Sequence, residues 1–375
     1  MLGNSFGRVF RVTTCGESYG AALLIIVDGV PPGLELCDAD VQKELDKRRP
    51  GTSPLDSPRL ETDQVQVVAG VMDGKTTGAP VGMIIYNVDR QDIHVEQYRK
   101  VKDLIRPGHA EYTFFVKYGR FADWCGAGRA SGRETAGRVA AGAVAKKLLG
   151  REAIEVIGYT VEAAGIKSNT AQMSFDELKA NKDKNHIHCP DLEAAAKMEK
   201  RILEIKEEGD TAGGVVEIVA HGVPAGLGEP VFDKLSASLS HGLMSIGATK
   251  GVEIGNGFAA ARMKGSEFND LPYLKDGKVR FRTNRSGGIA GGISSGEDIV
   301  CRIAVKPTAT ISKEQPTVNL AAMEEATLAA ITRRDATIVA RIVAVAEAMV
   351  AITLVDHLMM WRGYDAVANI EHPWP

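Results

Sequence analysis

The sequence has no excess of either charge. Its 45 lysine and arginine residues are balanced by 48 aspartate and glutamate residues, which gives a formal net charge of −3. A broad nucleic-acid surface needs a basic excess, because the neutralisation of phosphates dominates the affinity of such proteins. We therefore expect no nucleic-acid partner. Arginines that nevertheless cluster in this chain indicate local sites for small anions.

Cysteine is also scarce, and its spacing argues against disulfide and metal frameworks. The five cysteines are scattered and odd in number, and no CxxC pair occurs. This pattern indicates a reducing compartment, hence a cytoplasmic protein. His186-x-His188-Cys189 has no fourth ligand at a suitable spacing, so we expect an exposed loop and no metal site there. The first twenty residues are polar and motif-like, and no signal peptide is expected.

No uninterrupted apolar run is long enough for a membrane span. The longest apolar stretch, residues 336–360, is interrupted by Arg341, Glu347 and Asp356. A transmembrane helix needs about 20 consecutive, predominantly apolar residues. The stretch is therefore predicted to be a buried helix, and no membrane partner is expected.

Periodicity predicts groups of strands and helices rather than a regular alternation of the two. Segments rich in β-branched residues predict strands at 8–13, 21–28, 64–70, 81–87, 214–221, 251–258 and 298–306. Helical patterns cover residues 39–48, 134–149, 192–208, 230–246, 323–331 and 336–360. A purely parallel sheet is not required by this order. The polar segment 167–191 is expected to be an exposed insertion.

Two segments of the chain are similar to each other, and we call this similarity the internal echo. Residues 26–34, Ile-Val-Asp-Gly-Val-Pro-Pro-Gly-Leu, resemble residues 219–227, Val-Ala-His-Gly-Val-Pro-Ala-Gly-Leu. Both follow a predicted strand and lead toward a predicted helix. Chance similarity of two corners and an internal duplication with two related sheet-plus-helix halves are both open at this point.

A turn rich in glycine and arginine is the most informative candidate for a ligand site. Residues 125–136 read Cys-Gly-Ala-Gly-Arg-Ala-Ser-Gly-Arg-Glu-Thr-Ala. Ser131 and Glu134 have the spacing of a capping box, which predicts that a helix begins there. A helix N-terminus favours anions, and Arg129 and Arg133 add forked donors that match phosphate or carboxylate. The alternative is a surface turn with solvated arginines.

Basic residues stand beside glycine, proline or an acid at four other places. These are residues 47–51 (Lys-Arg-Arg-Pro-Gly), 106–109 (Arg-Pro-Gly-His), 306–308 (Lys-Pro-Thr) and 333–335 (Arg-Arg-Asp). Each alone is expected to be a solvated charge, but together they indicate a polyanionic ligand. His109 could transfer protons, or it could be a turn residue without a role. Asp335 could act on a ligand, form a surface ion pair or cap the helix 336–360.

A dinucleotide-type pattern offers a competing function. Residues 255–260 fit G-x-G-x-x-A after a predicted strand, as in a nicotinamide dehydrogenase that binds NAD(P)H. No helical pattern follows, and residues 262–265 (Arg-Met-Lys-Gly) interrupt the run. A dinucleotide fold is therefore not expected.

Many separate motifs in one order resemble the chorismate synthase family over nearly the whole chain. The matching segments are 16–20 (GESYG), 28–33 (DGVPPG), 48–51 (RRPG), 106–110 (RPGHA), 129–135 with 138–142, 222–230 (GVPAGLGEP), 250–255 (KGVEIG), 284 with 287–288 and 291–292, 306–308 (KPT) and 347–349 (EAM).

The resemblance implies a fold, a reaction and an assembly. The fold would be α+β, a single domain over residues 1–375 in which helices lie between antiparallel sheets with approximate internal pseudo-symmetry. The reaction would convert 5-enolpyruvylshikimate 3-phosphate into chorismate and phosphate, a 1,4-anti elimination in the shikimate pathway. The implied cofactor is reduced FMN, which some members reduce with NADPH. The implied assembly is a homotetramer.

The resemblance also implies roles for individual residues. His109 matches the histidine that faces the flavin, and Asp335 matches the acid that manages the proton at flavin N5. The implied substrate-binding residues are Arg48, Arg106 and Arg133. The implied flavin-binding residues are Arg129, Ala130, Ser131, Gly247, Ala248, Gly291, Lys306, Pro307, Thr308, Ala309, Thr310 and Arg333.

Several positions depart from the family pattern, and at two of them, Ala127 and Gly132 in the flavin turn, one small residue replaces another. Tyr19 replaces the histidine of Gly-Glu-Ser-His-Gly, the proposed proton donor to the departing phosphate, and a phenol with a reference pKa of about 10 is a weaker acid than imidazolium. Arg334 replaces a histidine beside the aspartate, and Pro54 stands where many members have a second substrate arginine. Tyr19 is kept as a candidate catalytic residue. The alternative function is a slow or non-catalytic paralogue that binds flavin or a phosphorylated ligand.

Overall fold

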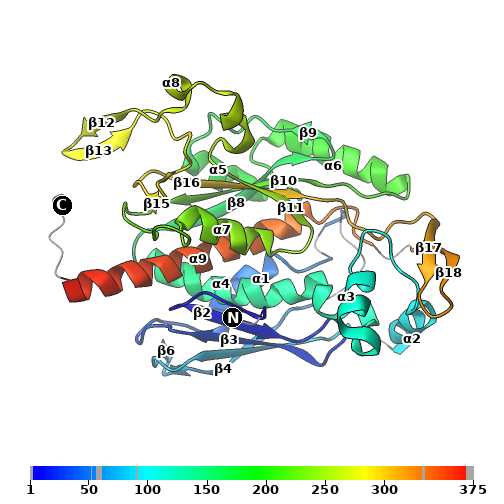
Figure 1. Ribbon diagram of the computed structural model, residues 1–375. Coiled ribbons are helices and arrows are strands. Elements are labelled where there is room, and N and C mark those ends of the chain that lie inside the picture. Colours follow the sequence, from blue (N-terminus) through cyan, green and yellow to red (C-terminus); the bar gives the residue numbers. More distant parts are fainter. Residues whose placement is uncertain (1–2, 52, 56–60, 90–91, 332–333, 369–375) are drawn as a thin grey trace.

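Helices lie between two antiparallel sheets (Figure 1). The structure is a computed structural model that describes the chain except residues 1–2, 52, 56–60, 90–91, 332–333 and 369–375. The first sheet has the order β1 (Ser5–Phe6), β2 (Arg11–Cys15), β3 (Ala22–Asp28), β7 (Val81–Tyr86) and β4 (Val65–Ala69). The second has the order β11 (Thr249–Ile254), β16 (Ile299–Val305), β10 (Gly214–His221), β8 (Glu155–Ala163) and β9 (Ile166–Lys167). The predicted α+β sandwich is confirmed.

The alternation of side chains in β3 explains why the first sheet has one covered face. Leu23, Ile25 and Val27 are buried toward the helices, whereas Leu24 and Ile26 are exposed on the other side. Successive side chains of a strand point to opposite faces, so every second residue of β3 joins the core.

Two long helices fill the space between the sheets. α4 (Thr135–Gly150) contacts β2 and β3, and α9 (Val339–Ala368) contacts β8 and β10. The two helices meet closely at Gly142, where a Cβ atom would lie 2.4 Å from Cβ of Ala348. α1 (Asp38–Asp46) packs on α4, and α7 (Leu235–Met244) packs on α9.

α9 confirms the buried helix predicted at 336–360, although it begins three residues later. Within the described part of the chain, Val339–Tyr364 is the one helix that is long and apolar enough to cross a membrane. Of its most apolar 18-residue window, 94% is buried inside the protein. A helix that is apolar on all sides and enclosed in this way is a core helix.

Two helices beside the second sheet include part of the segment expected to be an exposed insertion. α5 (Phe175–Asn181) and α6 (Leu192–Glu207) lie on the side of this sheet away from α9 (Figure 1). Residues 167–191 are only partly exposed, because Leu178, Ile187 and Cys189 are buried. Asp191 caps α6, and its Oδ1 accepts a hydrogen bond from the N–H of Ala194 (3.1 Å).

The two corners of the internal echo occupy equivalent places in the fold. β3 and β10 are each the central strand of a five-stranded sheet. Each strand is followed by a glycine with positive φ, 80° at Gly29 and 78° at Gly222. A Cβ atom at either glycine would collide with a backbone oxygen, that of Val9 or that of Ala153. Only glycine fits both corners without strain.

A bridging hydroxyl recurs in the same two corners. Thr76 Oγ1 donates to the carbonyl of Pro31 (2.6 Å) and accepts from the N–H of Leu34 (2.9 Å). In the second corner, Ser294 Oγ donates to the carbonyl of Pro224 (2.6 Å) and accepts from the N–H of Leu227 (2.8 Å). This repeated geometry favours an internal duplication over chance similarity.

The helix predicted at 323–331 is wrong. These residues contain β18 (Glu324–Leu328), which pairs antiparallel with β17 (Gln315–Asn319). The hairpin is also held from outside, since the N–H of Ile105 donates to the carbonyl of Val318. Pairing with a partner strand therefore overrides the local helical pattern.

Two further predicted elements are shorter than expected. The helix predicted at 230–246 begins at Leu235, whose N–H donates to the carbonyl of Gly292. The strand predicted at 251–258 ends at Ile254, and Gly257–Arg262 forms a 3-10 turn. The G-x-G-x-x-A segment thus leads into a short turn rather than the long helix of a dinucleotide fold.

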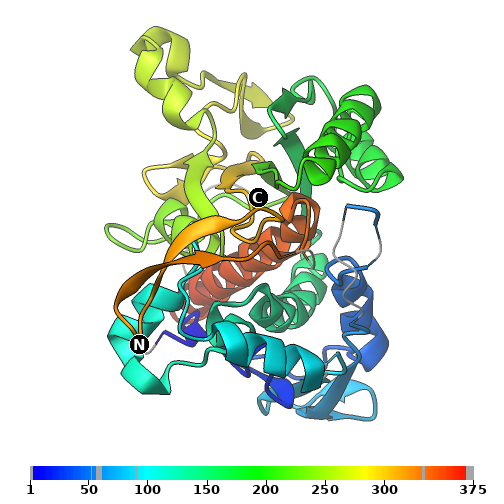
Figure 2. The ribbon, with the colours of Figure 1, turned by 90° about the vertical axis from the view of Figure 1, so that its right-hand side faces the viewer.

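Several elements were not predicted. They are β8 and the helices α2 (Asp92–Val101), α3 (Glu111–Tyr118), α5 and α8 (Gly265–Phe268), together with the short strands β1, β5 (Val71–Met72), β6 (Lys75–Thr76), β9, β12 (Pro272–Lys275), β13 (Lys278–Phe281), β14 (Ile289–Ala290), β15 (Ile293–Ser294) and β17. α2 and α3 lie next to the β17–β18 hairpin at one end of the molecule (Figures 1 and 2).

A buried carboxylate on α9 joins the helix layer to the second sheet. Glu347, 2% exposed, accepts a hydrogen bond from the N–H of Gly158 in β8 (2.7 Å). It also pairs with Lys146 of α4 (2.5 Å) and with Lys182 (3.4 Å). Burial raises the pKa of Glu347, but the charges of Lys146 and Lys182 outweigh this effect and hold the pKa at about 2.

We expect Glu347→Gln to lower the free energy of unfolding at pH 7 by about 3 kcal/mol, because the buried Lys182 and the partly buried Lys146 lose their shared counter-ion. The folded pKa is depressed, so the stabilisation by Glu347 is present above the unfolded pKa of about 4.3 and is lost as the pH falls toward 2. Urea titrations at pH 7 and pH 3 measure both effects. Glu193→Gln on the exposed side of α6 is the control, and equal stability of Glu347→Gln and wild type at pH 7 would contradict the prediction.

Candidate active site

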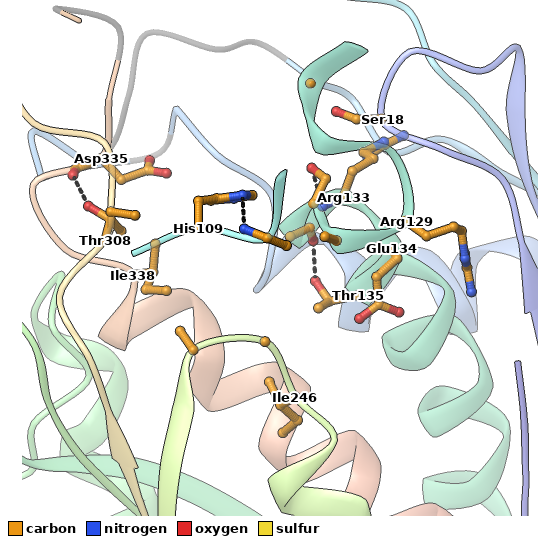
Figure 3. Close-up of a pocket in the computed structure, with 18 of the residues that line it drawn as sticks. Ser18, His109, Arg129, Arg133, Glu134, Thr135, Ile246, Thr308, Asp335 and Ile338 are labelled. Carbon is orange, nitrogen blue, oxygen red and sulfur yellow. Dashed lines mark hydrogen bonds between the residues drawn. The ribbon is translucent and has the colours of Figure 1, made fainter. Parts of the chain in front are cut away.

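A cavity of about 750 Å³ lies where the N-terminal ends of α4 and α9 meet loops from both sheets. Figure 3 shows His109 between Asp335 and Thr308 on one side and Arg133 and Ser18 on the other. Nine lining residues are arginine or lysine, and three are aspartate or glutamate. The cavity therefore has the charge that a polyanionic ligand needs.

Most of the sequence-predicted site residues come together here. Gly291 and Pro307 are not among the lining residues, and Arg333 lies outside the described residues. The predicted residues that line the cavity are Tyr19, Arg48, Arg106, His109, Arg129, Ala130, Ser131, Arg133, Gly247, Ala248, Lys306, Thr308, Ala309, Thr310 and Asp335.

Asp63 anchors the first cationic wall. Its fully buried carboxylate binds Arg48 (2.6 Å) with one oxygen and Arg133 with the other. Burial raises the pKa of Asp63, but the charges of Arg48 and Arg133 outweigh this effect and hold the pKa below its ordinary value. Arg133 also donates to Asn87 Oδ1 (2.7 Å), and Glu61 lies 4.0 Å from its Nη2. The wall is thus held rigidly from several directions.

Arg48 keeps one donor for a ligand. Its Nη1 donates to the carbonyl of Gly132 (3.2 Å) and to Thr135 Oγ1 (3.3 Å), and its Nη2 binds Asp63. Its Nε is buried, and no described residue is hydrogen-bonded to it. Buried donors in native proteins are nearly always paired, so this atom points to a missing acceptor.

The glycine- and arginine-rich turn has an unusual backbone. Gly126, Ala127 and Gly128 all have positive φ, and the turn continues into a second 3-10 turn before α4. The predicted capping box is wrong, because Ser131 Oγ accepts from the N–H of Arg133 rather than that of Glu134. Glu134 instead binds Arg138, one turn later (3.0 Å). The helix proper begins at Thr135.

The guanidinium of Arg129 holds the turn against the first sheet. It donates to the carbonyl of Gly16 (3.0 Å), to Thr14 Oγ1 (3.0 Å) and to Asn4 Oδ1 (3.1 Å). Figure 3 shows this side chain directed away from His109. Arg129 therefore lines the cavity with its turn, while its charged end is engaged with backbone and side-chain oxygens elsewhere.

Tyr19 lines the cavity beside the glycine- and arginine-rich turn. A Cβ atom at Gly126 would lie 2.6 Å from two carbons of the Tyr19 ring, so the ring rests on this glycine. The ring also meets Tyr98 of α2 edge-on, with 5.4 Å between centroids. The bulk of a tyrosine is accommodated because residue 126 has no side chain.

His109 belongs to a second cationic group at the start of α3. Arg106 Nε donates to Glu111 Oε1 (2.6 Å), and His109 Nδ1 lies 3.2 Å from Glu111 Oε2. Sequence reasoning missed Glu111, although its position two residues after the predicted histidine was a usable signal. The carboxylate holds both predicted residues together.

The opposite wall comes from the second half of the chain. Asp335 pairs with Arg341 of α9 (3.0 Å), and its carbonyl accepts a hydrogen bond from Thr308 Oγ1 (3.2 Å). Burial and the nearby charge of Lys250 lower the pKa of Lys306. Lys250 was not predicted, although it belongs to the matching segment 250–255. Two neighbouring ammonium groups favour an anion between them.

Arg334, one of the departures from the family pattern, has a structural task. It donates to the carbonyls of Lys206 (2.9 Å) and Asp210 (2.7 Å) at the end of α6, and to Ser312 Oγ (2.7 Å). Cations are favoured at the C-terminal end of a helix. Pro54 is exposed, and its carbonyl accepts from Lys206 Nζ (2.6 Å).

Comparisons with known proteins agree on one family. A family model for chorismate synthase matches residues 10–359. The chain is 56% identical, over an alignment of 392 positions, to a chorismate synthase of Acetivibrio thermocellus. The alignment covers 100% of this chain and 99% of that protein. The chain is 51% identical to one of Methanosarcina mazei, covering 96% and 97%. A crystal structure of chorismate synthase superposes with a TM-score of 0.75 at 29% identity, covering 94% and 93%.

We expect Asp63→Asn to lower the free energy of unfolding at pH 7 by about 3 kcal/mol, because Arg48 and Arg133 lose the carboxylate that they share. Chemical denaturation measures the change. Asp73→Asn, at the exposed turn between β5 and β6, is the matched control and should differ from wild type by less than about 0.5 kcal/mol. A wild-type midpoint for Asp63→Asn would mean that Asp63 does not hold the two arginines.

Proposed function

The chain belongs to the chorismate synthase family, and we propose that its cavity converts 5-enolpyruvylshikimate 3-phosphate into chorismate and phosphate with the help of reduced FMN. The reaction is a 1,4-anti elimination in which the C3 phosphate and a C6 proton leave. The observation that carries the proposal is a cavity lined by nine cationic side chains, one of which, Arg48, has a buried Nε with no hydrogen-bond partner among the described residues. The substrate brings a phosphate and two carboxylates to match them.

The residues of the second wall fit a flavin mononucleotide. A volume of about 750 Å³ falls in the usual range of roughly 300–1,000 Å³ for small-molecule sites. Lys306 and Thr310 offer a cation and a hydroxyl for a phosphate, and Gly247 and Ala248 allow a close approach of the backbone. When bound, reduced flavin supplies electron density that helps the substrate phosphate to depart.

The residues of the chain would bind and orient the substrate and the flavin, and they would balance the charges of both ligands. Arg48 and Arg133 would hold the substrate phosphate, and Arg106 a further anionic group of the substrate. His109 would face the flavin, and Asp335, paired with Arg341, would hold a proton near its N5 edge. Fixed cations that already point at the position of a developing charge stabilise it without reorganisation.

Tyr19 need not supply the proton that the family histidine is proposed to give. The departing phosphate is an anion, and Arg48 and Arg133 are permanent cations fixed by Asp63. Such charge stabilisation serves a leaving group without proton transfer. The two relatives named above are chorismate synthases, and no comparison favours the slow or non-catalytic paralogue.

The free face of the first sheet supports the further proposal of a homotetramer. Leu24, Ile26 and Tyr86 are 43%, 50% and 51% exposed on the side away from the helices. Contiguous apolar surface of this kind marks interaction sites. All five cysteines are free, which suits the cytoplasmic location that we infer.

With photoreduced FMN under anaerobic conditions, we expect the purified protein to form chorismate and phosphate in equal amounts from 5-enolpyruvylshikimate 3-phosphate. Chorismate absorbance and a phosphate assay follow the reaction. Oxidised FMN serves as the control and should support no turnover. Absence of phosphate release at high protein concentration would contradict the proposed function.

We expect Tyr19→His to change kcat by less than about tenfold, below the roughly 10²–10⁴-fold contribution typical of general acid catalysis. The reason is that fixed arginines already stabilise the departing phosphate. Tyr19→Phe, which keeps the ring on Gly126 but removes the hydroxyl, is the matched variant. A hundredfold rise of kcat in Tyr19→His would show that the native site lacks an acid, and would favour the slow paralogue.

A further inference from the structure

Three polar groups surround Nδ1 of His109. The N–H of Ala110 lies 2.8 Å away, Glu111 Oε2 lies 3.2 Å away, and Arg106 Nη2 lies 3.5 Å away. None of the described residues is hydrogen-bonded to the other ring nitrogen, Nε2. The side of the ring that carries Nδ1 is therefore engaged by the protein, and Nε2 is left for a ligand in the cavity.

The N–H of Ala110 selects the tautomer of the neutral ring. An N–H group donates only to a bare ring nitrogen, so a neutral His109 carries its proton on Nε2. We assign this tautomer from the hydrogen-bond partners of the ring. The neutral ring thus presents an N–H donor to the cavity.

Glu111 provides the acceptor that a charged ring needs. Its Oε1 is bound by Nε and Nη2 of Arg106, while its Oε2 is buried and has no hydrogen-bond partner among the described residues. A second proton on His109 goes to Nδ1, which lies 3.2 Å from this oxygen. The two groups then form a charge-assisted hydrogen bond, and the unpaired oxygen is satisfied.

The charge state of Glu111 agrees with this arrangement. Burial raises the pKa of Glu111, but the hydrogen bond that a protonated His109 donates and the charge of Arg106 outweigh this effect and keep the pKa below its ordinary value. The side chain is therefore a carboxylate at neutral pH, with one oxygen committed to Arg106 and the other available to His109.

We propose that Glu111 is a positioning residue that acts through His109 and Arg106. It receives the second proton of His109 at Nδ1, so that Nε2–H faces the cavity in both protonation states of the ring. It also fixes the guanidinium of Arg106 beside the ring. His109 then remains a hydrogen-bond donor toward an anionic reduced flavin whatever its charge. The inference rests on the proposed function for the identity of that anion.

The first test uses the ligand-free protein and needs no turnover. In protein labelled with ¹⁵N-histidine, the signals of His109 are identified by their loss in His109→Asn. The ¹⁵N shifts of the neutral ring should show protonation at Nε2. Protonation at Nδ1 would overturn the proposal, whether or not the protein proves to be a chorismate synthase.

The second test removes the charge of Glu111 and keeps its shape. In the anaerobic assay we expect Glu111→Gln to lower kcat and to raise KM, each by roughly tenfold or more, as for the loss of a hydrogen bond to a charged group. Glu96→Gln on α2 removes an exposed carboxylate that pairs with Arg99 (3.3 Å) and is the matched control. It should leave both constants within about twofold of wild type.

A double variant separates action through His109 from a merely structural role. In a His109→Asn background, Glu111→Gln should alter kcat by less than about twofold, because the ring through which it acts is gone. It should still raise KM, because Arg106 is still released. A tenfold loss of kcat in this background would overturn the proposal. Turnover by the wild-type protein in the same assay separates that outcome from a failure of the proposed function.

Discussion

One buried carboxylate has to neutralise two arginines, and the cavity depends on this arrangement. Asp63 lies beside β4, Arg48 follows α1, and Arg133 precedes α4, so one side chain joins three parts of the first half of the chain. Removing two guanidinium groups from water is costly unless they are paired and hydrogen-bonded. The structure pairs both with Asp63, and in the part of the chain that it describes Arg48 Nε has no hydrogen-bond partner. The pairing of both arginines with one carboxylate thus leaves the Nε–H donor of Arg48 unused among the described residues.

The cavity lies at the seam between two similar halves. The glycine corners after β3 and β10 repeat in detail, yet the two halves supply different chemistry to the cationic cavity. The first half brings Arg48, Arg133 and His109, and the second half brings Lys306 and Asp335. Under the proposed function, the substrate would meet the first set and the flavin the second. A duplicated framework thus serves two unlike ligands.

Local patterns predicted those features that depend on neighbouring residues. β10 begins and ends where its β-branched run does, and α4 starts within one residue of the predicted position. The helix expected at 323–331 failed because a distant partner strand determines its conformation. Asp63 could not be found from sequence, since 15 and 70 residues separate it from its two arginines. The role of Arg334 was hidden for the same reason, because its acceptors lie at the end of α6.

The contact between Gly142 and Ala348 reaches beyond the packing of two helices. Thr135 and Arg138 stand on α4, and Ile338 and Ile342 stand just before and on α9, all on the cavity side of that contact. The two helices approach each other closely at Gly142, a position without a side chain. The width available to a ligand is therefore set about one turn away from the nearest lining residues, at Gly142, which has no side chain. Selection on the size of the ligand would act on that glycine without any atom of the ligand touching it.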